Sequence, residues 1–173
     1  MRSYSKNNIA PRDTYNRPIS DLRVSLLDQC NFRCTYCMPE REFHSEYQFL
    51  KKHQRLSHEE IFRIVKIAVE LGVTKVRLTG GEPLLDKNIS KLINLISEVK
   101  EIEDLALTTN GVLLRKHAND MMKAGLHRIT ISLDSIDEVT FNKMNGNRAS
   151  VKKVLDGIEA AEKAGFDKIK INT

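Results

Sequence analysis

A unit of eight residues occurs three times in this chain, and it constrains the fold more than any other feature. The copies occupy residues 71–78, 124–131 and 164–171, and each has glycine at its second position. Glycine is the residue that most readily caps the C-terminus of a helix, and the residues after it alternate between apolar and polar, as in a strand. A helix that ends directly before a strand, three times over, is typical of alternating β and α elements with parallel strands.

The rest of the chain supplies the other members of this alternation. Leu22, Val24 and Leu26 alternate with polar residues and predict a first strand. Ser57 and Glu60 form a capping-box pattern that starts a helix ending near Gly72. Further elements are expected as a helix at 89–100, a strand at 105–108, a helix at 113–122 and a helix capped by Ser150.

The predicted strands have one apolar and one polar side. The polar positions are Arg23, Arg77, Thr130, Ser132 and Lys170. A doubly wound sheet buries both faces and reads as almost uniformly apolar, so this pattern favours a barrel wall whose polar side faces a lumen. We therefore predict an α/β fold, an incomplete (β/α) barrel of parallel strands with outer helices and with its active site at the C-terminal strand ends.

Composition sets the broad class. The 173 residues, of which 40% are hydrophobic and 29% charged, suit one globular domain, which we place at residues 21–173 after an N-terminal arm at 1–20. The arm has no apolar run, so we expect neither a secretory signal nor a membrane span. Reduced cysteines indicate a cytoplasmic location. The formal charge of +5 suits an anionic ligand without deciding which one.

All the cysteines lie in one short stretch. Cys30, Cys34 and Cys37 follow the first strand with a C-x3-C-x2-C spacing, which suits metal ligation better than disulfide pairing because the count is odd. A closed zinc site would need a fourth ligand such as His44 or His53. A 4Fe–4S cluster held by three thiolates would leave one iron open for a substrate or cofactor.

Four motifs at successive strand ends carry a family resemblance. With the cysteine triad, they are Gly80-Gly81-Glu82-Pro83, Thr108-Thr109-Asn110-Gly111 and Ser132-Leu133-Asp134, and over residues 21–173 the set resembles the radical S-adenosylmethionine superfamily. The stretches 21–23, 31–34, 36–39, 77–84 and 107–111 look like the GTP 3′,8-cyclase family of molybdenum cofactor biosynthesis.

The resemblance implies roles for individual residues. It implies that Cys30, Cys34 and Cys37 ligate the cluster. It also implies that S-adenosylmethionine is contacted by Tyr36, Gly81, Thr108 and Ser132. GTP contacts fall to Arg23, Arg77 and Lys170, and from the residues themselves we expect three buried lumen cations to require an anionic partner.

The resemblance also implies a reaction. An electron from the cluster cleaves S-adenosylmethionine, and the resulting 5′-deoxyadenosyl radical takes the 3′ hydrogen of GTP, giving (8S)-3′,8-cyclo-7,8-dihydroguanosine 5′-triphosphate. No catalytic residue is expected beyond the cluster and the cofactor. A reducing electron donor and GTP are the implied partners. We expect no membrane or nucleic-acid partner. Formation of a homodimer is a further expectation.

The chain departs from the cyclase family at its C-terminal side. That family has a further region with a second cysteine triad for a second 4Fe–4S cluster, whereas no cysteine follows Cys37 here and the chain stops within its fifth predicted strand. We therefore expect an N-terminal part, truncated before barrel completion, that does not turn over fully alone. The alternatives are a radical S-adenosylmethionine enzyme that modifies a peptide and a non-catalytic, basic zinc module that contacts nucleic acid.

Overall fold

The computed structural model describes residues 11–173, and the first ten residues of the predicted arm lie outside it. These residues form one parallel sheet in the order β1-β2-β3-β4-β5. Its strands are β1 (Asp21–Ser25), β2 (Lys75–Thr79), β3 (Asp104–Thr109), β4 (Arg128–Ser132) and β5 (Ile169–Asn172). The helices are α1 (His58–Glu70), α2 (Ile89–Ser97), α3 (Leu114–Lys123), α4 (Glu138–Asn145) and α5 (Val151–Lys163), with short 3-10 turns at Lys52–Gln54 and Pro83–Leu85.

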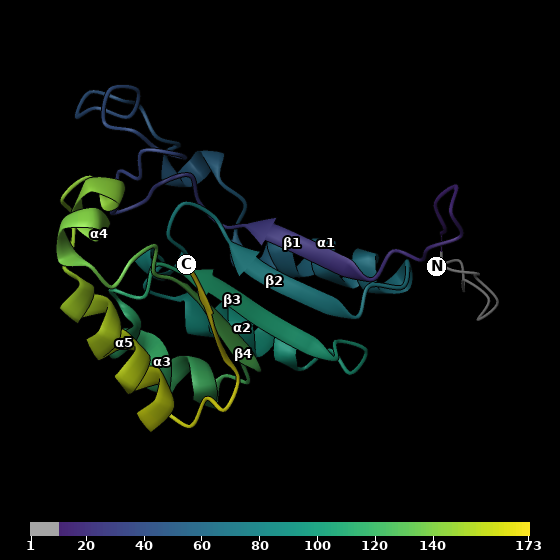
Figure 1. Ribbon diagram of the computed structural model, residues 1–173. Helices are drawn as coiled ribbons and strands as arrows, with labels where there is room; N and C mark the ends of the chain where they lie inside the picture. Colours follow the sequence, from purple (N-terminus) through teal and green to yellow (C-terminus); the bar gives the residue numbers. More distant parts are fainter. Residues whose placement is uncertain (1–10) are drawn as a thin grey trace.

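The strand order decides where the helices lie. Each strand pairs with the next one along the chain and the order never reverses, so right-handed crossovers place their helices on one face. Figure 1 shows α1 and α2 behind the sheet, with the opposite face turned toward the viewer. The predicted incomplete barrel is therefore confirmed. No helix within residues 11–173 has the length and apolar character needed to cross a membrane.

The two faces of the sheet differ as the alternation predicts. Arg23 lies opposite Arg77, and Thr130 lies opposite Lys170, on the face that the helices leave open. The other face packs on the helices. On the edge strand β5, Ile171 of this face is 38% exposed; the fully buried central side chains are Val76, Leu78, Leu105, Leu107, Ile129 and Ile131. Burying each of these side chains contributes roughly 1.5–3 kcal/mol, which makes this face the main source of stability.

Three details differ from the sequence prediction. Helix α2 ends at Ser97 and not near residue 100, and Ser150 occupies the N-cap of α5 without a side-chain hydrogen bond. Helix α4 was not predicted at all. Its only buried apolar side chain is Phe141, so no helical period of apolar residues marks it, although Asp137 caps its start and Gly146, in the left-handed conformation, caps its end.

The cysteines occupy residues 26–38, which we call the cysteine loop. Its first part continues the β1–β2 ladder: Leu26 N–H donates to the Thr79 carbonyl (3.0 Å), Gly81 N–H to Leu27 (2.7 Å) and Glu82 N–H to Gln29 (2.8 Å). A Cβ on Gly81 would lie 2.0 Å from the Gln29 carbonyl oxygen, and one on Gly80 would lie 2.7 Å from the Leu27 oxygen. The two glycines are therefore required because the chain itself passes this close.

The second part of the cysteine loop is held by α4. The Arg33 N–H donates to the Asn145 carbonyl and the Thr35 N–H to the Met144 carbonyl, both at 3.1 Å. Phe141 packs edge-on against Phe32 with ring centroids 6.1 Å apart. The loop is thus fixed on both sides by backbone hydrogen bonds.

We predict that Gly81→Ala destabilises the metal-free chain by about 1–3 kcal/mol, because the new methyl group forces the Gln29 backbone to move. Urea unfolding of the wild-type and variant chains measures this loss. Thr35→Ala is the control, since Thr35 is exposed in the same loop and its change should stay within about 0.5 kcal/mol. Equal stability of Gly81→Ala and the wild type would contradict the close-approach explanation.

Candidate functional site

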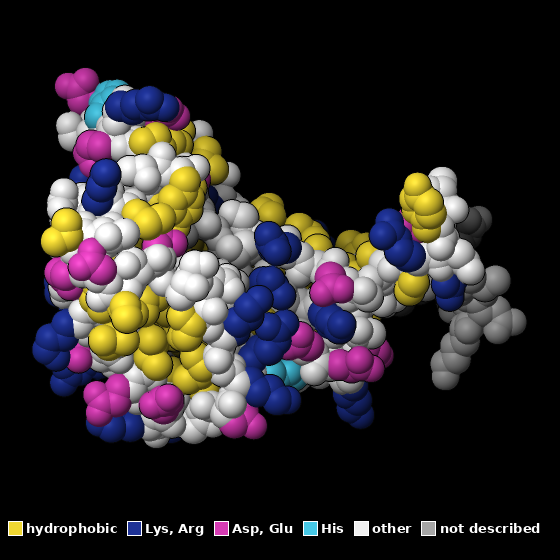
Figure 2. Space-filling model, in the orientation of Figure 1, with side chains coloured by type: hydrophobic (Ala, Val, Ile, Leu, Met, Phe, Trp, Pro, Cys, Tyr) yellow, Lys and Arg dark blue, Asp and Glu magenta, His cyan; other side chains and the backbone are white. Residues whose placement is uncertain are grey.

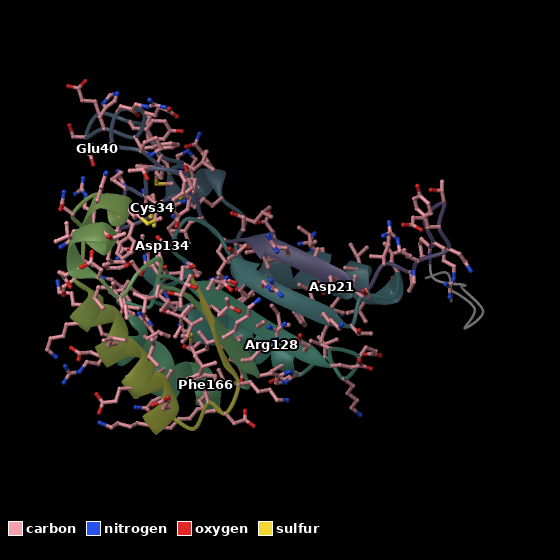
Figure 3. All side chains as sticks on the ribbon, viewed as in Figure 1. Asp21, Cys34, Glu40, Arg128, Asp134 and Phe166 are labelled. Atoms are coloured by element: carbon pink, nitrogen blue, oxygen red, sulfur yellow. The ribbon has the colours of Figure 1, made fainter. Side chains whose placement is uncertain are left out.

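The candidate site lies at the C-terminal ends of the strands. In Figure 3, Cys34 and Asp134 lie close together at that end, whereas Asp21 and Arg128, the first residues of β1 and β4, lie toward the strand starts. The cysteine loop follows β1, and the loops after β2, β3 and β4 carry the other predicted motifs. Parallel strands therefore bring segments that are distant in sequence to one edge of the sheet.

The three cysteines are free thiols that face one cavity. Cys30 is half-buried, Cys34 is buried and Cys37 is exposed. All three line a cavity of about 300 Å³ together with Gly81 and Met38. The structure thus brings together the predicted cluster ligands and one of the predicted cofactor contacts.

Burial makes these thiols weak acids in the metal-free chain. It raises the pKa of all three, and for Cys34, where the neighbouring Cys37 adds to the effect, the pKa reaches about 12. A nucleophilic cysteine and a metal-ligating cysteine both act as the thiolate, so this shift opposes both roles. The positive charge of a bound metal lowers the pKa of a thiol, so ligation at these cysteines would depend on that charge.

The donor set distinguishes a cluster from a single metal ion. Among the described residues, no three His, Cys, Asp or Glu side chains come together as they would around one ion. His44 and His53 are exposed and do not line the cysteine cavity. Three thiolates on one cavity can each bond to a different iron of a 4Fe–4S cluster, whereas a closed zinc site needs a fourth ligand that neither histidine supplies to this cavity.

Of the four predicted S-adenosylmethionine contacts, Gly81 alone lines the cysteine cavity. Gly81 lines the cysteine cavity, but the contact that explains this glycine is with Gln29 and not with a ligand. Thr108 and Ser132 are half-buried at the ends of β3 and β4 and lie outside that cavity. Tyr36 is 60% exposed, and its hydroxyl donates to both carboxylate oxygens of Asp134, at 3.0 and 3.1 Å.

The most buried acidic group of the site was not predicted as a site residue. Glu82 is only 1% exposed and accepts hydrogen bonds from the Leu84 N–H (3.0 Å), the Thr109 hydroxyl (2.7 Å) and the Asn110 N–H (2.8 Å). Burial raises the pKa of Glu82, and these three donors oppose the rise. Its carboxyl joins the loop after β2 to the loop after β3, a pairing that no local pattern indicates.

The predicted GTP contacts are divided between two places. Arg23 and Arg77 lie side by side on the open face and line a cavity of about 130 Å³, whereas Lys170, on β5, does not line it. Within the described residues none of the three forms an ion pair. Arg23 and Lys170 are exposed and Arg77 is half-buried, so the expectation that burial forces an anionic partner on them is wrong.

A further arginine lies near this pair and was missed. Arg128 is in register with Ala106, which is in register with Arg77, so Arg23, Arg77 and Arg128 share one row of the open face. Asp104 accepts hydrogen bonds from Arg128 Nε (2.7 Å) and from its terminal nitrogen (2.6 Å), and this guanidinium holds the pKa of Asp104 below its usual range. Figure 2 shows dark blue side chains gathered over this face. The alternation in β4 could have revealed Arg128.

Comparison with solved structures agrees with this fold. HydG, a maturase of the [FeFe]-hydrogenase, matches 87% of the chain with a TM-score of 0.68 and 20% identity, and 34% of its own chain is covered. SuiB of Streptococcus suis, solved bound to S-adenosylmethionine, matches 87% of the chain with a TM-score of 0.60 and 18% identity, and 40% of its own chain is covered. At these identities the likeness concerns the fold alone.

Comparison of sequences goes further. A GTP 3′,8-cyclase of Xanthomonas campestris is 50% identical over 161 residues, and one of Staphylococcus epidermidis is 47% identical over 161 residues. These matches cover 93% of this chain but 47% of each relative, so the chain spans about half the length of the curated relatives it matches. The family model of the radical SAM superfamily matches residues 24–173. The chain therefore belongs to the radical SAM superfamily.

Proposed function

We propose that this chain is the cluster-bearing part of a GTP 3′,8-cyclase, with Cys30, Cys34 and Cys37 as ligands of a 4Fe–4S cluster. The observation that carries the proposal is the convergence of three free thiols on one cavity at the C-terminal strand ends. The identity of 50% to a protein of that name supports the choice of reaction.

The predicted binding residues have two separate roles in this proposal. Gly81, Thr108, Ser132 and Tyr36 bind and orient S-adenosylmethionine beside the cysteine loop. Arg23, Arg77 and Lys170 bind the triphosphate of GTP from the open face, where the first two lie in register on adjacent strands. When bound, the cluster and S-adenosylmethionine supply the radical chemistry that removes the 3′ hydrogen of GTP.

The proposal extends to the biological setting. The product enters molybdenum cofactor biosynthesis, and a reducing electron donor delivers one electron to the cluster. The region expected after this chain would hold the second 4Fe–4S cluster and the purine base. A homodimer and a cytoplasmic location stay predictions.

The first prediction concerns metal content. Anaerobic reconstitution of the chain should give about four iron and four sulfide per chain, as expected for a 4Fe–4S cluster. Cys34→Ser should lose most of this iron, because a serine hydroxyl is a poor substitute for a soft thiolate ligand. Iron and sulfide assays together with the visible absorption spectrum measure both quantities.

Ser135→Ala is the matched control, since it changes a side chain outside the cysteine cavity, and it should keep the wild-type iron content. Stoichiometric zinc without iron uptake would reject the cluster and support the zinc-module alternative.

The second prediction concerns the substrate. Arg77→Ala should weaken GTP binding to the intact enzyme that contains this chain roughly ten- to a hundredfold, because a charge-assisted contact to phosphate contributes about 1.5–3 kcal/mol. Guanosine, which lacks phosphate, should bind equally to both forms. Isothermal titration with GTP and guanosine measures the difference.

Arg63→Ala provides the control, since Arg63 is an exposed cation on α1, away from the open face of the sheet. It should leave GTP binding unchanged. Equal losses for GTP and guanosine in Arg77→Ala, or no loss at all, would argue against the triphosphate role and favour the peptide-modifying alternative.

A further inference from the structure

The loop after β3 reaches the first cysteine through one side chain. The Asn110 amide nitrogen lies 2.7 Å from the Asn31 side-chain oxygen and 4.0 Å from the Cys30 sulfur. Asn110 is 79 positions from Asn31 and 80 positions from Cys30 in the sequence, and the three residues meet beside a proposed cluster ligand. Neither Asn110 nor Asn31 has a role in the function proposed so far.

The orientation of the Asn110 amide follows from its neighbours. Its side-chain oxygen accepts a hydrogen bond from the Val112 N–H at 3.2 Å, so the nitrogen must face the cysteine loop. The nitrogen carries two hydrogens. One hydrogen serves the Asn31 oxygen, and the other is available to the Cys30 sulfur.

Glu82 fixes Asn110 from the other side. Its buried carboxylate accepts the Asn110 backbone N–H at 2.8 Å and also the Thr109 hydroxyl at 2.7 Å. Asn110 is itself buried, so its side chain has little room to turn away. The amide therefore points at the cysteine loop through packing and hydrogen bonds within the chain.

A second hydrogen-bond donor, the Phe32 backbone N–H, also faces the Cys30 sulfur. The Phe32 N–H lies 3.4 Å from the sulfur, and the Asn31 oxygen lies 3.9 Å from it. A thiol can donate to that oxygen, but a thiolate bound to iron can only accept. With iron bound, the donors facing the sulfur are the Phe32 N–H and the Asn110 amide.

We propose that Asn110 is a positioning residue that acts through Cys30: its amide donates to the Cys30 thiolate and raises the reduction potential of the cluster. The inference rests on the cluster assigned under the proposed function. Reduction adds one electron from a low-potential one-electron donor, and no bond forms or breaks. A hydrogen-bond donor at a ligand sulfur stabilises the added negative charge, and such bonds are among the determinants of cluster potential.

The experiment is a redox titration of the reconstituted chain, with dithionite as reductant, followed by electron paramagnetic resonance without S-adenosylmethionine. Asn110→Leu, similar in size and without the donor, should shift the midpoint potential to a more negative value at unchanged iron content. Asn94→Leu is the matched control, because it makes the same substitution at an exposed amide on α2, which donates to Glu98 and does not face the sulfur. It should leave the potential unchanged.

Asn31→Ala keeps the inference testable if Asn110→Leu does not fold. It removes the oxygen that holds the Asn110 amide at 2.7 Å, so the amide loses its fixed position beside the sulfur and the potential should also become more negative. An unchanged potential in Asn110→Leu, an equal shift in Asn94→Leu, or an unchanged or higher potential in Asn31→Ala would overturn the inference. If the wild type takes up no 4Fe–4S cluster, the proposed function itself fails, which is a distinguishable result.

Discussion

The site depends on a backbone ladder that continues beyond the strands that begin it. After β1 and β2 end, the chain segments at 26–30 and 79–82 still exchange hydrogen bonds, and they approach so closely that no Cβ fits at Gly80 or Gly81. Because backbone atoms make these contacts, the position of the cysteine loop is set by the sheet itself. The cysteines are thus held by the same backbone hydrogen bonding that joins β1 to β2.

The second support is the buried Glu82 carboxyl. It accepts three hydrogen bonds from two loops but has no cation beside it among the described residues, so the carboxylate is stabilised by neutral donors. Removing one donor from a buried charged group costs more than a typical hydrogen bond contributes. This explains how one side chain can hold the ends of β2 and β3 at a fixed distance and direct Asn110 toward the cysteine loop.

Local patterns in the sequence were enough for most of the fold. The repeated helix–glycine–strand unit predicted the parallel sheet, and the alternation in β2 and β4 predicted which face carries Arg77 and which is apolar. Helix α4 was not predicted from the sequence because Phe141 is its only buried apolar side chain. Its contribution to the site comes from contacts with the cysteine loop, which depend on tertiary structure.

The site was predictable as a set of residues but not as a geometry. The cysteine spacing predicted three thiols at one place, which line one cavity in the structure. The Gln29 contact that requires Gly81, the bond from Tyr36 to Asp134 and the pair of Arg128 with Asp104 all join segments far apart in sequence. Such pairings are set by strand register, which periodicity within one strand does not specify.

The central claim is that backbone contacts with the loop after β2 fix the cysteine loop, and hydrogen exchange of the chain tests it most directly. The Gly81 and Glu82 amides, which donate to Leu27 and Gln29, should exchange as slowly as the core amides of β2. Exchange of these two amides at the rate of an unstructured loop, while β2 stays protected, would contradict the account.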